Sequence, residues 1–273
     1  MLARVGGDHL DAFLSELSRS ARAAGYAPQT HRYGDGEDHE ADLMLPAAGA
    51  TGRLAVVLHG GFWRARYKRS IMEALAFDLV QRGWATWNVE YRRVGAGGGV
   101  PQTLDDIRLA IESLRTLDAP VDAERVLVIG HSAGGQLALV SARAAAVAAV
   151  VSLAGVCDLE SGARDRIGGG AVLDFVGGTP EQRPVEYAIA DPLQLLPVDA
   201  DVLLVHGELD DNVPVQQSRD YLSAARAGGR CHLLELAGVE HFALIDPRTR
   251  AWRVVADRLD ALLPPGPDGD DVS

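Results

Sequence analysis

Short runs of apolar residues recur along the chain, and most are too short and too continuous to be amphipathic helices. The stretches "RLAVVLH" at 53–59 and "RVLVIG" at 125–130 contain only apolar residues between their end positions. Continuous runs of this kind are typical of strands that are buried on both faces of a parallel sheet. The pattern predicts strands at 41–46, 53–59, 84–91, 125–130, 148–155, 201–207 and 231–238.

Between these runs the apolar positions change to helical spacing. In residues 10–24, for example, Leu10, Leu14 and Leu17 fall on one helical face. The same reasoning predicts helices at 10–24, 71–82, 103–116, 133–145, 215–226 and 248–263. Strands that alternate with helices in this way predict an α/β fold, with a mostly parallel central sheet flanked by helices on both faces.

One segment, 156–197, interrupts the alternation. It contains three consecutive glycines and the stretches "VGGTPEQRP" and "ADPLQLLP", and we expect it to be a small lid-like insertion over one end of the sheet. The terminal stretch 264–273, "PPGPDGDDVS", is acidic and rich in proline, which predicts a disordered tail. Residues 1–263 are then expected to form a single domain.

Composition narrows the class of partner. The chain has 273 residues, of which 47% are hydrophobic and 23% charged, with a formal net charge of -12. Ligands with many phosphate groups need a basic surface, so we expect neither nucleic acid nor an anionic membrane as a partner. Ligands of parallel α/β sheets bind beyond the carboxyl ends of the strands, and a small-molecule substrate is expected there. The oligomeric state stays open, a homodimer included.

The cysteines and the apolar stretches bear on compartment and cofactor. Cys157 and Cys231 form neither a disulfide framework nor a metal motif, so we expect a reduced cytoplasmic protein without a metal or organic cofactor. The N-terminal stretch has early acidic residues and no continuous apolar core, unlike a signal peptide. The longest apolar stretch, 137–156, is interrupted by Arg143, and a buried helix that leads into a buried strand explains it better than a membrane span.

The first candidate for chemistry is "GHSAG", from Gly130 to Gly134, which lies between a predicted strand and a predicted helix. This Gly-x-Ser-x-Gly pattern fits a sharp turn that lifts the Ser132 hydroxyl clear of the sheet as a nucleophile. The helix start would supply free backbone N–H groups, including that of Ala133, to an oxyanion. The alternative is a glycine-rich helix start with a capping serine, which the context makes less attractive.

A serine hydroxyl needs a base, and the base needs an acid that holds its tautomer. The stretch "HGELDDNVP" offers Asp210 and Asp211 as the acid, and "AGVEHF" places His241 after the last predicted strand. The order Ser, acid, His along the chain is that of folds in which the nucleophilic serine lies on a turn between a strand and a helix. His206 ends a strand ahead of the turn and is interpreted as structural.

The stretch "HGGFW" follows the buried strand at 53–59. Its glycines leave backbone N–H groups unshielded and permit unusual φ and ψ angles. We therefore expect the N–H groups of Gly61 and Phe62 to complete an oxyanion hole with that of Ala133. Without the "GHSAG" pattern, a plain strand-ending turn would explain it equally well.

From about Asp42 to Leu263 the chain resembles the α/β-hydrolase superfamily, with "DLMLP", "HGGFW", "NVEYRR", "GHSAGG", "HGELDDNVP" and "GVEHF" in the expected order. The resemblance implies that Asp210 is the acid and that Ser132, Asp210 and His241 form a catalytic triad. His-Gly-Gly-x-Trp is the pattern of kynurenine formamidases, so it implies an arylformamidase that hydrolyses N-formylkynurenine. The alternative is a carboxylesterase for short acyl or aryl esters. Two more distant alternatives are an acyl transferase and a binding protein that has the hydrolase fold but no catalytic activity.

Three aromatic residues near these motifs are candidates for contacts with the substrate: Trp63, Tyr91 and Phe242. Trp63 could stack on an aromatic substrate or wall a small acyl pocket, or it could simply pack the loop into the core. Tyr91 and Phe242 carry the same two interpretations. The stretch "ADPL", from Ala190 to Leu193, departs from the Ser-Pro of many relatives, and this departure bears on substrate choice.

Overall fold

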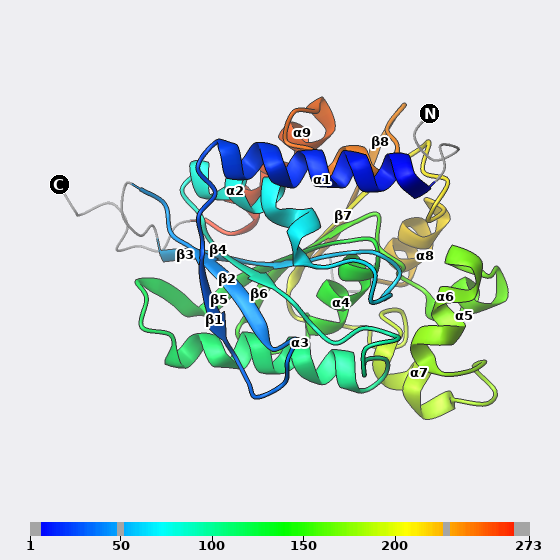
Figure 1. Cartoon of the computed structure of the whole chain (residues 1–273). Helices are drawn as coiled ribbons and strands as arrows, with labels where there is room; N and C mark the ends of the chain where they lie inside the picture. The colour runs from blue at the N-terminus through cyan, green and yellow to red at the C-terminus, as the bar shows by residue number, and fades with distance from the viewer. Residues whose placement is uncertain (1–6, 48–51, 226–229, 265–273) are drawn as a thin grey trace.

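The computed structural model describes residues 7–47, 52–225 and 230–264. Its centre is an eight-stranded sheet with the strand order β1-β2-β4-β3-β5-β6-β7-β8 (Figure 1). The strands are β1 (Gln29–Arg32), β2 (Glu40–Met44), β3 (Gly52–Leu58), β4 (Ala85–Val89), β5 (Val121–His131), β6 (Val147–Leu153), β7 (Asp201–Gly207) and β8 (Cys231–Leu236). Strands β1 and β2 pair antiparallel, and every pair from β4 to β8 is parallel.

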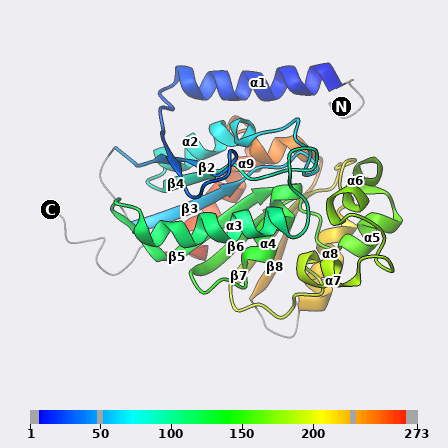
Figure 2. The same ribbon diagram turned by 60° about the horizontal axis from the view of Figure 1, so that its bottom comes forward.

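Helices cover both faces of the sheet. One face carries α1 (Gly7–Ala23), α2 (Glu73–Gln81) and α9 (Arg250–Leu262), and the other carries α3 (Gln102–Glu112), α4 (Ala133–Ser141) and α8 (Gln216–Ala225) (Figure 2). Short 3-10 turns are η1 (Arg69–Met72), η2 (Ser113–Thr116) and η3 (His241–Ile245). The two helical layers bury two hydrophobic clusters, one on each side of the sheet.

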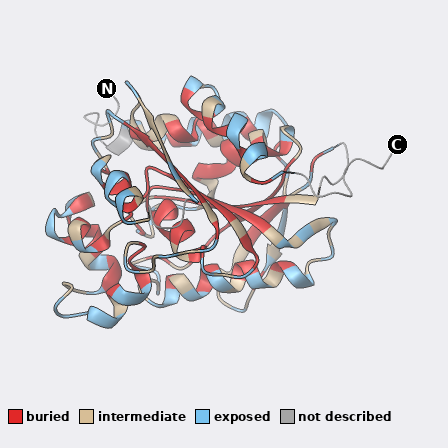
Figure 3. Ribbon diagram, turned by 180° about the vertical axis from the view of Figure 1, so that it is seen from behind, coloured by how far each residue is buried: buried red, intermediate tan, exposed pale blue. Residues whose placement is uncertain are grey.

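The burial pattern explains why the strands could be predicted. Every residue of β4 is buried, as are the last five of β3, and Figure 3 shows the central strands as the most deeply buried part of the fold. A strand covered on both faces must be apolar throughout, which is the signal the sequence carries. The predicted parallel sheet with helices on both faces is confirmed.

Segment 156–197 contains three helices between β6 and β7: α5 (Leu159–Arg164), α6 (Ile167–Val176) and α7 (Pro184–Ala190). They lie together beyond one end of the sheet (Figures 1 and 2). The predicted disordered tail at 264–273 falls outside the described residues, apart from Pro264. Among the helices that the structure describes, none has the length and apolar character needed to cross a membrane.

Candidate active site

Ser132 lies on a tight turn between β5 and α4. Its backbone has φ 56° and ψ -118°, a strained conformation for a residue with a side chain. The turn depends on close approach at both flanking glycines. A Cβ on Gly130 would collide with the backbone of Gly134, and a Cβ on Gly134 would lie 2.5 Å from the carbonyl oxygen of His59. The predicted Gly-x-Ser-x-Gly pattern therefore corresponds to a strand–turn–helix with the serine at its apex.

His241 and Asp210 are joined by a short hydrogen bond. His241 Nδ1 lies 2.6 Å from Asp210 Oδ2, and both side chains are almost completely buried. Asp210 Oδ1 accepts 2.9 Å hydrogen bonds from the backbone N–H groups of Asn212 and Val213. Since the carboxylate accepts from Nδ1–H, the lone pair of a neutral imidazole is on Nε2. Asp211, the other acid left open by the sequence, contacts Asn212 at the surface.

The electrostatics favour an ionised Asp210. Burial would raise the pKa of this carboxyl, but hydrogen bonds from His206 and His241 outweigh it and hold the pKa well below its usual range. His206 Nε2 lies 3.5 Å from Asp210 Oδ2 and 2.8 Å from the carbonyl oxygen of Val213. His206, interpreted as structural from the sequence, thus lies in the shell that supports the acid.

His131 is a residue that the sequence analysis did not single out. Its Nε2 donates a 3.1 Å hydrogen bond to the carbonyl oxygen of His241, and the two rings lie 4.4 Å apart. This contact places His241 beside the turn that carries Ser132. Burial, followed by the charge of His241, lowers the pKa of His131 well below its ordinary value, so the ring is neutral.

Ser132 and His241 are each 2% exposed. Within the described residues no hydrogen bond joins Ser132 Oγ to the imidazole, and His241 Nε2 has no other hydrogen-bond partner there. Nucleophile–base hydrogen bonds are often long without substrate and tighten when it binds. The free lone pair of a neutral His241 is on Nε2, the ring nitrogen that does not face Asp210.

Residues 59–63, here called the oxyanion loop, lie directly against the turn. A Cβ on Gly60 would lie 3.0 Å from Ser132 Cβ. Gly61, Phe62 and Trp63 have consecutive positive φ angles of 109°, 54° and 55°. In the described part of the chain, no group accepts a hydrogen bond from the backbone N–H groups of Gly61, Phe62 and Ala133. The three N–H groups predicted as oxyanion donors thus have no hydrogen-bond partner among the described residues.

The three aromatic candidates have different surroundings. Trp63 is fully buried, stacks on Phe175 at 4.5 Å and donates from Nε1 to Gln136 Oε1 at 3.0 Å. Tyr91 is also fully buried, and its hydroxyl donates to the carbonyl oxygen of His59 at 2.6 Å. Both side chains thus pack in the core, which is one of the two interpretations that the sequence left open.

Phe242 is partly exposed, and its ring meets that of His241 edge-on at 4.9 Å. It is the one aromatic candidate of the three that could contact a substrate.

The insertion covers this region through α6. Arg64 Nη2 donates to the carbonyl oxygen of Gly168 at 2.9 Å, and a Cβ on Gly168 would lie 2.5 Å from the ring of Phe62. The α6 segment begins in a left-handed conformation, with positive φ at Arg166 and at Gly168, Gly169 and Gly170. Segment 156–197 thus contacts the oxyanion loop where Gly168 lies against Phe62.

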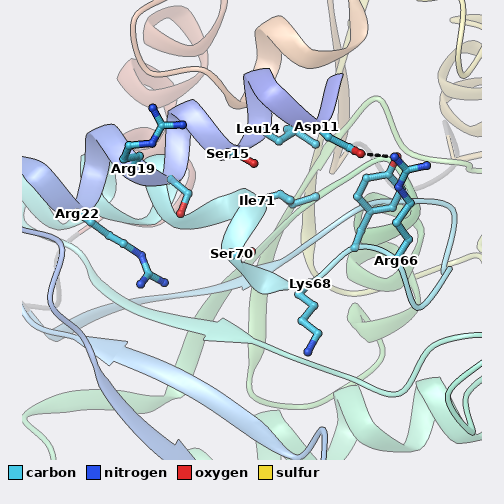
Figure 4. Close-up of a pocket in the computed structure, with 11 residues that line it drawn as sticks. Asp11, Leu14, Ser15, Arg19, Arg22, Arg66, Lys68, Ser70 and Ile71 are labelled. Carbon is cyan, nitrogen blue, oxygen red and sulfur yellow. Dashed lines mark hydrogen bonds and ion pairs between the residues drawn. The ribbon is translucent and has the colours of Figure 1, made fainter. Parts of the chain in front are cut away.

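A separate groove of about 610 Å³ lies between α1 and η1. Figure 4 shows Arg66, from the chain that follows the oxyanion loop, meeting Asp11 of α1 at one end of the groove. Neither Ser132, Asp210 nor His241 lines it. Three of its arginines pair with acids, Arg19 with Glu16, Arg22 with Glu73 and Arg66 with Asp11, so the groove holds little unpaired charge.

The described residues contain no cluster of side chains suited to bind a metal ion. Within residues 7–47, 52–225 and 230–264, no group of three or more His, Cys, Asp or Glu side chains could hold an ion.

Comparison with known proteins agrees with this geometry. A sequence profile described as BD-FAE matches residues 41–224, which include Ser132 and Asp210. Esterase LipC of Mycobacterium tuberculosis is 28% identical over 217 residues, which make up 70% of this chain and 53% of LipC. The uncharacterized peptidase YtmA of Bacillus subtilis is 34% identical over 102 residues, 36% of this chain and 40% of YtmA. The chain thus spans about half or less of these two relatives.

Solved structures show the fold. A truncated carbohydrate esterase from gut microbiota superposes with a TM-score of 0.73 at 19% identity, over 86% of this chain and 96% of that one. Esterase 2 of Thermogutta terrifontis with bound propionate superposes with a TM-score of 0.71 at 19% identity, over 86% of this chain and 93% of that one. The chain has the α/β-hydrolase fold.

Proposed function

The chain belongs to the BD-FAE family of α/β hydrolases, and on that premise we propose that it is a serine esterase that cleaves esters of small acyl groups. The observation that carries the proposal is the strained Ser132 turn, which lies beside the hydrogen-bonded pair of His241 and Asp210. A buried serine at a strand–helix apex and a buried His–Asp pair have no common purpose in packing, whereas nucleophilic catalysis requires both.

In the proposed reaction, Ser132 Oγ attacks the ester carbonyl carbon while His241 Nε2 takes the hydroxyl proton. The tetrahedral oxyanion accepts hydrogen bonds from the backbone N–H groups of Gly61, Phe62 and Ala133. His241 then gives the proton to the departing alcohol oxygen, which leaves an acyl group on Ser132. Water, activated by the same imidazole, releases the acid and restores the serine. Asp210 holds the Nδ1–H and stabilises the imidazolium in both steps.

Two observations support a small acyl group. Ser132 is 2% exposed, and the Phe62 ring lies under Gly168 of the insertion, so the space beside the nucleophile is confined. Among the structural relatives, esterase 2 of Thermogutta terrifontis has been solved with propionate and with butyrate bound. We propose that this chain also binds short acyl groups.

The predicted arylformamidase activity is the rival hypothesis. It depends on the "HGGFW" pattern, and the part of that pattern that distinguished it, Trp63, is buried and stacks on Phe175. The named relatives given above are esterases and an uncharacterized peptidase. These points favour the ester, so the carboxylesterase alternative replaces the formamidase as the main proposal.

The deciding experiment compares N-formylkynurenine with nitrophenyl esters from acetate to octanoate, using the purified protein and Ser132→Ala as the control. We expect kcat/KM to be highest for acetate to butyrate, negligible for N-formylkynurenine, and abolished for every substrate in Ser132→Ala. A kcat/KM for N-formylkynurenine above that of all the esters would restore the formamidase. Equal turnover by Ser132→Ala would exclude the serine mechanism altogether.

A further inference from the structure

The chain that forms the oxyanion loop is held at both ends by one buried carboxylate, that of Glu90. Glu90 follows β4 directly and is 2% exposed. Its Oε1 lies 3.0 Å from Nε2 of His59, where the oxyanion loop begins. Its Oε2 accepts a 3.1 Å hydrogen bond from the backbone N–H of Arg69, where the same chain enters η1. One side chain thus fixes the separation of these two points.

Two arginines fix the carboxylate itself. Arg93, also 2% exposed, donates from Nη1 to Glu90 Oε1 and from Nη2 to Asp38 Oδ1 at 2.9 Å. Arg69 Nη1 lies 3.8 Å from Glu90 Oε2. A buried charge needs such partners on each side, and once they are in place the carboxylate has one orientation.

His59 connects the Glu90 carboxylate to the turn that carries Ser132. Its ring lies between Glu90 Oε1 and the carbonyl oxygen of Gly60, which is 2.8 Å from Nδ1. Gly60 in turn lies against Ser132. The positive φ angles of the non-glycine residues Phe62 and Trp63 are the kind of strain that persists only where the surroundings enforce it.

We infer that Glu90 is a positioning residue for the oxyanion hole, one that aims the N–H groups of Gly61 and Phe62 at the reacting oxygen. It touches neither substrate nor Ser132, and it acts through His59 and the Arg69 backbone. The inference rests on the proposed function, since an oxyanion hole matters only if Ser132 attacks a carbonyl.

The test is Glu90→Gln, which keeps the size of the side chain. Donors face both carboxylate oxygens, so the amide nitrogen must oppose at least one of them and release one end of the chain. The matched control is Asp106→Asn. Asp106 is 1% exposed and accepts from His39 Nε2 at 2.9 Å, Arg92 Nη2 at 2.6 Å and Arg92 N at 2.8 Å. It has the same kinds of partner but no contact with the oxyanion loop.

Two readouts are measured for each folded variant. The first is kcat and KM with nitrophenyl acetate, and the second is the rate at which a fluorophosphonate modifies Ser132, followed by mass spectrometry. Loss of a direct oxyanion donor costs on the order of 100-fold or more, and we expect misplacement of donors in Glu90→Gln to lower both rates by about 10- to 100-fold with KM within about twofold. Asp106→Asn should lose thermal stability but keep both rates within about twofold.

The outcomes separate the two proposals. Equal rates in Glu90→Gln and wild type, or equal losses in Glu90→Gln and Asp106→Asn, would overturn the positioning role. A wild-type protein that neither reacts with fluorophosphonate nor cleaves any ester would overturn the proposed function itself. Should Glu90→Gln fail to fold, His59→Asn breaks the same contact from the other side, and it must show the same fall in kcat without a rise in KM.

Discussion

His131 lies on the turn that carries Ser132, and it helps to hold His241 in place through a hydrogen bond to the backbone of that residue. Its Nε2–H is committed to the carbonyl oxygen of His241, and its Nδ1 is buried with no partner in the described part of the chain. A ring whose pKa is lowered by burial stays neutral and adds no charge next to the imidazolium that forms on His241. The sequence could not reveal this, because Gly-x-Ser-x-Gly leaves its second position unspecified.

Trp63 gives a prediction at the scale of a single residue. Trp63→Phe keeps the aromatic stack on Phe175 but removes the donor to Gln136 Oε1, which stays buried without a partner. An unsatisfied buried acceptor costs about 1–3 kcal/mol. Urea denaturation should therefore show a free energy of unfolding that is lower by this amount. Since Trp63 is fully buried, KM for nitrophenyl acetate should stay within about twofold. A tenfold rise in KM with unchanged stability would instead place Trp63 in contact with substrate.

The residues that carry chemistry were predictable to different degrees. Ser132, Asp210 and His241 each lie at a strand end with a local motif, and the structure places them at the carboxyl ends of β5, β7 and β8. Glu90 and Arg93 lie in "NVEYRR", a stretch noted only for its resemblance. Their role depends on contacts with Arg69 and Asp38, far away in sequence. No local pattern records such contacts.

At the scale of elements, the parallel strands were the most predictable and the antiparallel edge strand β1 the least. Strand β1 was not predicted, because "QTHR" is polar and almost wholly exposed. It pairs on one side only, so burial imposes no apolar pattern. The helices of the insertion were also missed. They are short, and α6 begins with left-handed glycines that helical propensity disfavours.

The insertion is anchored to the rest of the fold near the unusual "ADPL". Gln136 of α4 donates from Nε2 to the carbonyl oxygen of Ala190 at 2.7 Å, while its Oε1 accepts from Trp63. Asp191 accepts hydrogen bonds from the backbone N–H groups of Glu160 and Leu193. One glutamine thus joins the oxyanion loop to the end of α7, and one aspartate joins α5 to the chain after α7.

Asp191 predicts a pH dependence for this element. Burial raises its pKa to about 6, and the charge of Asp158 adds to the rise, although backbone N–H groups oppose it. An unfolded aspartate titrates near about 3.9. Between about pH 4 and pH 6 the folded chain therefore binds more protons than the unfolded chain, so the free energy of unfolding falls as the pH rises.

The corresponding experiment is urea denaturation of the wild type and Asp191→Asn from pH 4.5 to 7.5. Between pH 4.5 and pH 7.5 the free energy of unfolding of the wild type should fall by about 2 kcal/mol relative to that of the variant, because asparagine does not titrate. Parallel pH profiles for the two proteins would show that Asp191 keeps an ordinary pKa.

For the whole molecule, the architecture separates stability from chemistry. The two hydrophobic clusters lie on opposite faces of the sheet, whereas Ser132, Asp210 and His241 follow the carboxyl ends of β5, β7 and β8. The sheet and its helices follow from hydrophobic patterning and could be read from the sequence. The space at the edge depends on how the insertion rests on the oxyanion loop, which patterning does not encode.

That contact predicts the range of substrates. The Phe62 ring packs against Gly168 of α6, whereas the proposed oxyanion donor of this residue is its backbone N–H, so a change of side chain leaves the donor in place. Phe62→Ala keeps the N–H and removes the ring between the loop and α6, which should widen the space beside Ser132. We expect the ratio of kcat/KM for nitrophenyl octanoate to that for the acetate to rise by about tenfold, since each buried methylene contributes about 0.8 kcal/mol where room exists.

Leu209 is a suitable control position for this experiment because it is exposed and lies outside the contact between loop and insertion. Leu209→Ala should leave the ratio of octanoate to acetate unchanged. If the ratio in Phe62→Ala is unchanged and acetate turnover is intact, the acyl chain does not pass between the oxyanion loop and α6. If the ratio rises equally in both variants, the fold has loosened in general. The packing contact of Phe62 with Gly168 would then have no part in selecting the acyl group.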